Sequence, residues 1–163
     1  MKRTLWTLAM CVAAPLAGAA GSSAVDDKAR AQQITRSADQ GSTAGPEDYF
    51  TGQVRVDPLF AASEEINASG AYVTFAPGSR SAWHTHPAGQ RLVVVSGVGL
   101  TQEWGKPAQQ IHPGDVVVCP PGVKHWHGAA ADGAMTHLAV TGSVDGKSVT
   151  WMEKVTDEQY QNR

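Results

Sequence analysis

Three histidines and one glutamine have the types and spacing needed to bind a single divalent metal ion. His84 and His86 are two residues apart. Residues at this spacing on a β-strand point to the same face, so the two imidazoles would be neighbours. Gln90 can return on the next strand, and His125 can arrive from a distant one. These residues would form a site of three imidazoles and one amide oxygen, with positions left open for water or substrate.

Glycines and prolines frame the two blocks that carry these residues. The first block runs from Gly78 to Gly97, and the second runs from Gly114 to His125 and includes Pro120 and Gly122. One histidine alone is more often an ordinary residue that is hydrogen-bonded at a strand end. Three of them in this frame favour a metal site. For Gln90 the alternative is a polar residue that holds a turn, and we favour a ligand.

Two further histidines could handle a substrate proton. His127 lies two residues beyond His125 and shares its inward face if that stretch is a regular strand. It could be an extra ligand, a residue that orients a ligand, or a pocket wall that handles protons, and we favour the last. His137 follows Met135 and Thr136. From the sequence alone, a core histidine bonded to the backbone and a general base are nearly equal alternatives for it.

Short strands must position these side chains. From Phe50 onward the chain consists of brief apolar or alternating runs separated by Gly and Pro, with no long helical period. This pattern predicts an all-β sandwich or barrel. The predicted strands cover residues 53–57, 70–76, 91–96, 98–103, 115–119, 125–129, 136–141 and 148–155.

The chain changes pattern at its C-terminal end. Thr156 and Gln159 have capping-box spacing, and Val155 can pack on Tyr160 as a hydrophobic staple. We therefore expect a short helix that begins at Thr156 or Asp157.

The N-terminal end resembles a secretory signal. Lys2 and Arg3 precede an apolar run from Leu5 to Leu16, and Ala17-Gly18-Ala19 is a cleavage pattern. We predict a signal peptide over residues 1–20, a polar N-terminal arm over 21–49 and a single domain over 50–163. The mature protein would be exported, to the periplasm or beyond, and the apolar run is too short for a comfortable membrane span.

Charge and cysteine content exclude several classes of partner. The chain has 13 basic and 15 acidic residues, so removal of Lys2 and Arg3 leaves 11 minus 15, a net charge of −4. Neither nucleic acid nor an anionic membrane surface is an expected partner.

Cys119 would be the only cysteine left, in the apolar run from Val116, and we expect a small buried hydrophobe. Lys124, beside His125, is expected to be solvated.

The two framed blocks resemble the paired motifs of the cupin superfamily. Further strings resemble small bacterial cupins that include the manganese-dependent hydroxynitrile lyases: HTHPAGQ, KHWHGA, AMTH and GKSVTWMEKVTDEQY. The resemblance implies a cupin-type, jelly-roll-like double-sheet barrel with a short C-terminal helix. Two departures stand out, since most metal-binding cupins have Glu at the position of Gln90, and the usual Asn is Ala129 here. The lyases of this subfamily also have Gln at that position.

The resemblance implies a divalent metal held by His84, His86, Gln90 and His125. A neutral amide leaves more of the +2 charge uncompensated than a carboxylate, which suits redox-neutral polarisation of a bound oxygen. Mn²⁺ is our first expectation and Fe²⁺ the second, while Ni²⁺, Cu²⁺ and Zn²⁺ also bind nitrogen-rich sites.

The implied activity is that of a lyase that cleaves or forms a carbon–carbon bond in small hydroxylated compounds such as cyanohydrins. His137 would take the substrate proton, with His127 beside it. A quercetin-dioxygenase-like enzyme is an alternative, although an amide at position 90 cannot accept a proton as the family's Glu is expected to do. A non-catalytic cupin that binds a metal or ligand is a third. Cupin barrels often exchange N-terminal strands, so we expect a homodimer or a higher homo-oligomer in which residues 50–59 are exchanged between subunits.

Overall fold

The computed structural model describes residues 31–161. The predicted signal peptide over residues 1–20 lies outside this range. The chain divides into two compact units, Met1–Ile34 and Thr35–Arg163. Of the first unit, residues 31–34 are described, and they are exposed and have no regular structure. Within residues 31–161, no helix has the length and apolar character needed to span a bilayer.

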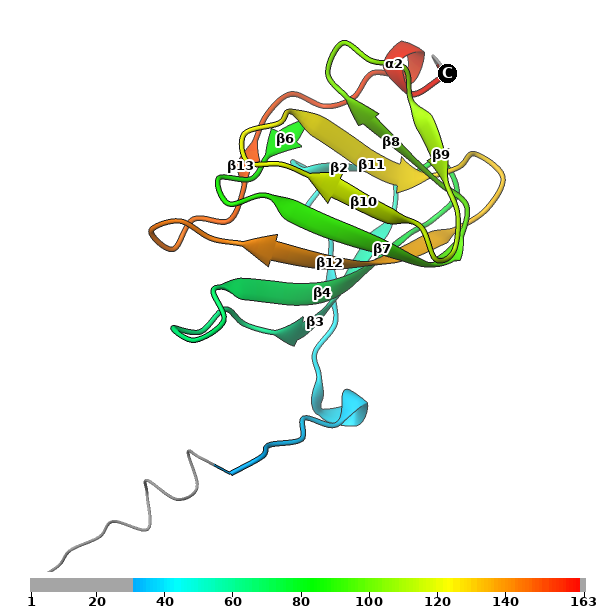
Figure 1. Ribbon diagram of the computed structural model, residues 1–163. Coiled ribbons are helices and arrows are strands. Elements are labelled where there is room, and N and C mark those ends of the chain that lie inside the picture. Colours follow the sequence, from blue (N-terminus) through cyan, green and yellow to red (C-terminus); the bar gives the residue numbers. More distant parts are fainter. Residues whose placement is uncertain (1–30, 162–163) are drawn as a thin grey trace, which may run out of the picture. The chain divides into compact units, whose positions relative to one another are not determined.

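The second unit contains two antiparallel sheets, shown in Figure 1. The first sheet has six strands in the order β1-β3-β4-β12-β7-β10. Their bounds are β1 (Thr43–Ala44), β3 (Val54–Phe60), β4 (Ala68–Phe75), β12 (Met135–Gly142), β7 (Gln90–Gly97) and β10 (Val116–Cys119).

The second sheet has seven strands. Five follow the order β13-β6-β11-β5-β2, and β8 joins β11 to β9. Their bounds are β13 (Thr150–Trp151), β6 (His84–Thr85), β11 (His125–Ala129), β5 (Arg80–Ser81), β2 (Phe50–Thr51), β8 (Gly99–Glu103) and β9 (Gln109–Ile111). Strand β11 is buried along its whole length, so each of its side chains meets other protein atoms.

The main apolar core is formed by side chains from both sheets. Phe75, Leu92 and Met135 of the first sheet are fully buried in one cluster with Phe50 and Ala129 of the second. Alternation along each strand sends one set of residues to this core, as in β7, where residues 90, 92 and 94 are buried and residues 91 and 95 are exposed. The all-β double-sheet fold predicted from the sequence is confirmed.

A second apolar cluster lies under the C-terminal segment. Trp83 and Trp126, which flank two of the candidate ligand histidines, pack with Leu100, Val155 and Tyr160. Alternation predicts that these tryptophans face away from the metal site, and they do. The predicted helix is α2 (Asp157–Gln161).

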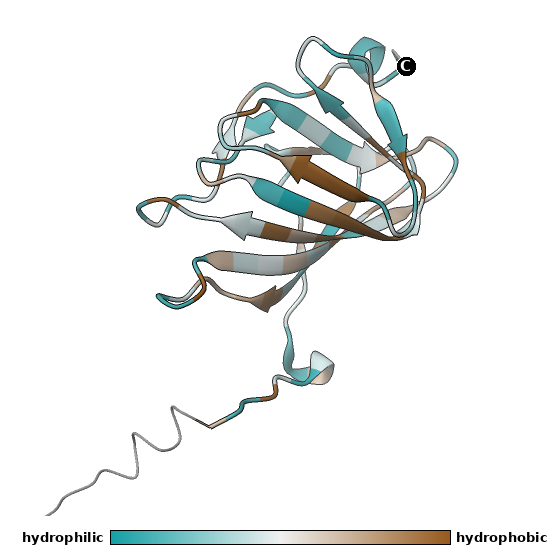
Figure 2. Ribbon diagram, in the orientation of Figure 1, coloured by the Kyte–Doolittle hydropathy of each residue, from teal (hydrophilic) through white to brown (hydrophobic). Residues whose placement is uncertain are grey.

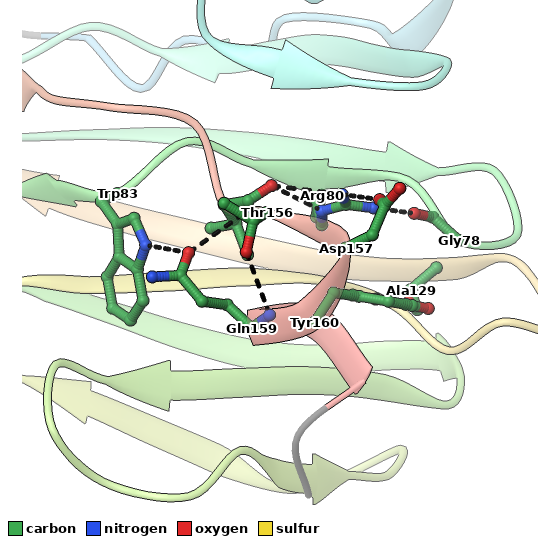
Figure 3. Close-up of polar contacts among 9 residues, drawn as sticks. Gly78, Arg80, Trp83, Ala129, Thr156, Asp157, Gln159 and Tyr160 are labelled. Atoms are coloured by element: carbon green, nitrogen blue, oxygen red, sulfur yellow. Dashed lines mark hydrogen bonds and ion pairs between the residues drawn. The ribbon is translucent and has the colours of Figure 1, made fainter.

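Arg80 belongs to a polar group that joins the C-terminal segment to the barrel (Figure 3). Its guanidinium donates to the Val155 carbonyl at 3.3 and 3.1 Å, and to Asp157 Oδ1 at 2.5 Å. The Trp83 indole donates to Gln159 Oε1 at 3.1 Å. We call this group the Arg80 cluster; its members are Arg80, Trp83, Thr156, Asp157, Gln159 and Tyr160.

The structure contains five strands of two or three residues that the sequence pattern did not predict: β1, β2, β5, β6 and β9. Segments this short do not show the alternation by which a strand is recognised. The first of them and a 3₁₀ turn, η1 (Ser37–Asp39), fall within the stretch expected to be a polar arm. At the other end, the strand predicted over 148–155 is regular only at β13, although Met152 and Glu153 still form backbone hydrogen bonds with Trp83.

Gly97 shows why a framing glycine is needed at the end of β7. Its φ is +75°, a conformation that other residues rarely adopt. A Cβ at this position would also lie 1.9 Å from the Ala134 carbonyl oxygen. Gly97 therefore allows β7 to turn closely past β12.

Candidate metal centre

The four residues predicted as ligands are brought together inside the barrel. His84 is on β6, opposite His125 on β11 in the register of the second sheet. His86 follows directly after β6, and Gln90 begins β7 of the first sheet. The ring centroids of His84 and His125 are 4.3 Å apart, and those of His84 and His86 are 5.0 Å apart. All four side chains are buried.

Backbone carbonyls fix the orientation of the three imidazoles. His84 Nδ1 is 2.9 Å from the Ala82 oxygen, and His125 Nδ1 is 2.9 Å from the Val123 oxygen. His86 Nδ1 is 2.6 Å from the oxygen of Ser148. A carbonyl oxygen only accepts hydrogen bonds, so each Nδ1 must carry the proton. Each Nε2 of a neutral ring is therefore an unprotonated lone pair, the form in which histidine binds metals.

Several buried polar atoms at the centre have no hydrogen-bond partner among the described residues. These include His86 Nε2, His125 Nε2 and Gln90 Oε1. Buried polar atoms are nearly always paired, because leaving one unpaired costs about 1–3 kcal/mol. Two nitrogen lone pairs and an amide oxygen in one place would be satisfied together by a cation. The donor set therefore fits a divalent metal ion.

Burial keeps these histidines neutral. It lowers the pKa of His125 to about 4, and it also lowers the pKa of His86. For His84 the pKa is well below the ordinary value, first because of burial and then because of the neighbouring His125. Metal binding near neutral pH would therefore displace few protons.

His127 and His137 form a hydrogen-bonded pair beside the candidate ligands. His137 Nε2 lies 3.1 Å from His127 Nδ1, and both rings are buried. Burial lowers the pKa of His137 to about 4; the pKa of His127 is well below its ordinary value because of burial and the nearby His137. Both rings are therefore neutral near pH 7 and one can accept a proton.

His127 was expected to line the pocket, and it also lies close to the candidate ligands. One ring nitrogen from each of His84, His125 and His127 lies within 4.8 Å of the others. His127 Nε2 has no hydrogen-bond partner among the described residues. The structure thus brings all five predicted site histidines and Gln90 close together, and it places His127 next to the candidate ligands His84 and His125 as well as next to His137.

A cavity of about 340 Å³ opens onto three of the candidate ligands, His84, His86 and Gln90, and onto the pair His127 and His137. Trp151 forms one wall, with its ring 4.8 Å from that of His84 and stacked on Tyr49 at 4.8 Å. The remaining apolar lining consists of the Phe50 ring and of smaller residues: Pro46, Val56, Ala71, Val73, Ala139 and Val149. A larger groove of about 790 Å³ over β1 and β3 contains none of the predicted site residues.

Sequence reasoning missed three contacts of the site. They are the Ser148 carbonyl on His86, the Thr141 hydroxyl on Gln90 and the Trp151 ring against His84. The Ser148 oxygen is a backbone atom and has no side-chain signal. Trp151 belonged to a predicted strand, but its pairing with β6 was not apparent from that pattern.

Comparison with known proteins agrees with this geometry. Residues 71–141 match the model of the cupin domain family. The (R)-mandelonitrile lyase of Granulicella tundricola is 58% identical over 128 residues, which cover 78% of this chain and 98% of the relative. The predicted resemblance is therefore confirmed.

Solved structures show the same fold. A cupin-like protein from Thermotoga maritima is 40% identical, with a TM-score of 0.70 over 80% of this chain and 96% of its own. A cupin-2 domain protein from Rhodospirillum rubrum, 21% identical, has a TM-score of 0.61 over 79% of this chain and 84% of its own. The chain belongs to the cupin family.

Proposed function

We propose that this protein is a metal-dependent cupin lyase that cleaves and forms cyanohydrins. The observation that carries the proposal is the group of neutral, oriented imidazoles, in which His86 Nε2 and His125 Nε2 are unpaired among the described residues, next to the hydrogen-bonded pair of His127 and His137 at an apolar cavity. The 58% identity to an (R)-mandelonitrile lyase supports the choice of reaction.

The proposed ligands are His84, His86, Gln90 and His125, with Mn²⁺ the first choice and Fe²⁺ the second. A divalent ion bound there would act as a Lewis acid on the substrate hydroxyl oxygen. The amide of Gln90 adds no negative charge, so the ion would keep its full polarising effect. His127 is the candidate for a fifth metal ligand, because its Nε2 has no hydrogen-bond partner among the described residues and its ring lies beside His84 and His125.

His137 is the proposed general base, and His127 shares its proton. In cleavage, the substrate O–H bond breaks and the proton goes to His137, while the carbon–carbon bond electrons leave with cyanide. A carbonyl compound forms, and the proton then passes to cyanide to give HCN. The hydrogen bond between His137 Nε2 and His127 Nδ1 allows the proton to be shared before it is released.

The cavity favours a small aryl or alkyl substrate. Its volume of about 340 Å³ is at the lower end of the range for ligand sites, and its lining is mostly apolar. The Trp151 ring, stacked on Tyr49, gives a flat wall for an aromatic substituent. The apolar lining also excludes bulk water from the histidine pair, which keeps both rings neutral.

The test is turnover of racemic mandelonitrile by the Mn²⁺-loaded protein, followed by the absorbance of benzaldehyde. His137→Ala should lower kcat by about 10²- to 10⁴-fold while metal content stays the same. An oxygen electrode should record no uptake during turnover. Oxygen consumption would favour a dioxygenase. Metal binding without turnover on a panel of cyanohydrins would favour a binding protein.

A homodimer formed through the outer face of the six-stranded sheet is also proposed. Residues that oppose one another across β10, β7, β12 and β4 form an apolar row on this face. Figure 2 shows β10 as continuously hydrophobic beside an apolar part of β7. The row consists of Val116, Val93, Leu138 and Tyr72.

The partner proposed for this face is a second copy of the chain. A two-fold axis brings the apolar row of one subunit into contact with the same row of the other. Strands lie about 4.8 Å apart, so a row across four strands spans about 14 Å, enough for the apolar centre of an isologous interface. Residues 50–59, expected to exchange between subunits, pair with β4 and β5 of their own chain.

Light scattering tests the dimer. Val118→Glu, at a side chain that is 55% exposed on this face, should convert the dimer to a monomer without loss of metal. Val144→Glu, at a side chain that is 47% exposed but outside the sheet, is the matched control. A monomeric unmodified protein, or a dimeric Val118→Glu variant, would remove this part of the proposal.

Export is proposed from the pattern of residues 1–20. Fractionation of cells and mass spectrometry of the mature N-terminus test it. A protein that starts near residue 20 in the periplasmic fraction supports export, and an intact Met1 in the cytoplasm opposes it.

A further inference from the structure

We propose that Thr141 is a positioning residue, which turns the side-chain amide of Gln90 so that its oxygen faces the metal ion. The inference rests on the metal site proposed above and concerns a residue outside the ligand set. It explains how an amide can replace a carboxylate at this position without loss of a defined geometry.

Thr141 and Gln90 lie directly opposite each other on β12 and β7. The Gln90 side chain is 6% exposed, so its amide must find partners within the barrel. Gln90 Nε2 donates to Thr141 Oγ1 at 3.0 Å. Both residues line the cavity that contains His84 and His86. The hydroxyl therefore holds one end of the amide at the edge of the candidate metal centre.

The two ends of an amide differ in what they can bind. The nitrogen donates two hydrogen bonds and offers no lone pair to a cation, whereas the oxygen has two acceptor lone pairs. Gln90 Oε1 has no hydrogen-bond partner among the described residues, and its nitrogen is held by Thr141. This is the orientation that a metal ion requires. A flipped amide would present N–H groups to the ion and repel it.

Thr141 is well suited to hold this orientation. Its side chain is branched at Cβ, and such side chains have few χ1 rotamers available, so the hydroxyl stays in place. A carboxylate at position 90 would not need such a contact, because both of its oxygens can bind a cation. The need for a positioning residue therefore follows from the presence of glutamine at this position.

Two substitutions separate the hydroxyl from the shape of the side chain. Thr141→Val keeps the branched shape and removes the hydrogen bond, whereas Thr141→Ser keeps the hydroxyl. Mn²⁺ affinity is measured by the electron paramagnetic resonance signal of the free ion during titration. We expect Thr141→Val to weaken binding by about 10- to 100-fold and to change the spectrum of the bound ion, with affinity restored in Thr141→Ser.

Thr136→Val is the matched control. It removes a threonine hydroxyl from the same strand, but that hydroxyl bonds to Thr74 at 3.0 Å on the outer face. Mn²⁺ affinity should stay within about twofold of the unmodified protein. Thermal unfolding in the presence of a chelator shows whether each metal-free variant is folded.

A double-mutant cycle with Gln90→Glu provides the decisive comparison. In the Gln90→Glu background, Thr141→Val should change Mn²⁺ affinity by less than about threefold, since either oxygen of a carboxylate can bind the ion and its orientation does not matter. An equal loss in both backgrounds would show that Thr141 only supports the fold, and the proposal would be wrong. It would also be wrong if Thr141→Val bound Mn²⁺ as well as Thr141→Ser, or if the unmodified protein bound no Mn²⁺.

These results are independent of the lyase assay. A protein that binds Mn²⁺ and shows the expected cycle, but turns over no cyanohydrin, would keep the role of Thr141 and lose the proposed reaction. A protein that turns over cyanohydrins but does not show the expected double-mutant cycle would keep the proposed reaction and lose the role of Thr141.

Discussion

Two polar groups of this barrel, each with a buried charged or polar side chain at its base, differ in how their hydrogen-bonding atoms are satisfied. In the Arg80 cluster, the guanidinium is bound by the Val155 carbonyl and by Asp157, and the Trp83 indole is bound by Gln159 (Figure 3). At the metal centre, His86 Nε2, His125 Nε2 and Gln90 Oε1 have no partner among the described residues.

The difference separates a contact that completes the fold from a site that needs a ligand. The Arg80 cluster joins the C-terminal segment to β5 with protein atoms alone. At the metal centre, Nδ1 of each imidazole contacts a backbone carbonyl, whereas His86 Nε2 and His125 Nε2 have no partner among the described residues. An ion should therefore stabilise the metal centre and have no effect on the Arg80 cluster.

Acid should destabilise the metal-free protein through the histidines of the metal centre. The pKa values of His125 and His137 are about 4 in the folded protein, against about 6.5 when unfolded. The unfolded state binds more protons between these values, so stability is complete above pH 6.5 and falls as the pH drops to 4. The loss should be about 3 kcal/mol for each of the two, by urea unfolding at several pH values.

Substitution of one buried histidine tests the origin of the acid effect. His137→Gln should flatten the profile. A profile that is flat in the unmodified protein between pH 6.5 and 4 would contradict the burial argument.

Arg80→Leu should unfold more easily with no change at the metal centre. The substitution removes charged hydrogen bonds to the Val155 carbonyl and Asp157, and it leaves that carbonyl unpaired. The expected loss of unfolding free energy is about 3 kcal/mol, while Mn²⁺ affinity stays within about twofold. Urea unfolding and Mn²⁺ titration measure the two quantities. A large loss of metal affinity would show that the two groups are coupled.

The features predicted well from the sequence depend on residues that are close along the chain. The spacing of His84 and His86, the tryptophans on the opposite face and the capping box at Thr156 are patterns over two to four residues. The Thr156 amide bonds to Gln159 Oε1 at 3.0 Å, and the Gln159 amide bonds to Thr156 Oγ1 at 3.1 Å. The relative positions of residues this close in the sequence are set by the local strand or helix geometry, so the structure reproduces each pattern.

The features that the sequence did not predict depend on pairings between distant segments. Arg80 is buried because the C-terminal segment returns to it, 75 or more residues later. Lys124 was expected to be solvated, which is wrong: its ammonium lies 3.4 Å from the centre of the Trp104 ring and pairs with Glu153. A cation over an aromatic ring is favourable, but the pairing is visible only once β8 lies beside β11.

A metal ion should stabilise the unmodified protein and fail to stabilise His84→Ala. Mn²⁺ at 100 times its dissociation constant should add about 2.7 kcal/mol to the unfolding free energy. His84→Ala removes one imidazole from the centre of the histidine group and should weaken binding by about 100-fold or more, so the same Mn²⁺ concentration adds little. Thermal unfolding with and without Mn²⁺ is the measurement. Equal stabilisation of both proteins would place the bound ion elsewhere.

The smallest expected effect is the loss of the capping box in Thr156→Ala. The substitution removes the acceptor of the Gln159 amide and leaves the first turn of α2 with an unpaired N–H. Unfolding free energy should fall by about 1 kcal/mol, as for other N-cap substitutions, while Mn²⁺ affinity stays the same. Thr43→Ala is the control, because its exposed hydroxyl makes a long 3.5 Å contact with Val56 and should cost less than about 0.5 kcal/mol. A Thr156→Ala variant with normal stability and weakened Mn²⁺ binding would reverse the roles assigned to the two groups, since the C-terminal segment would then act on the metal centre.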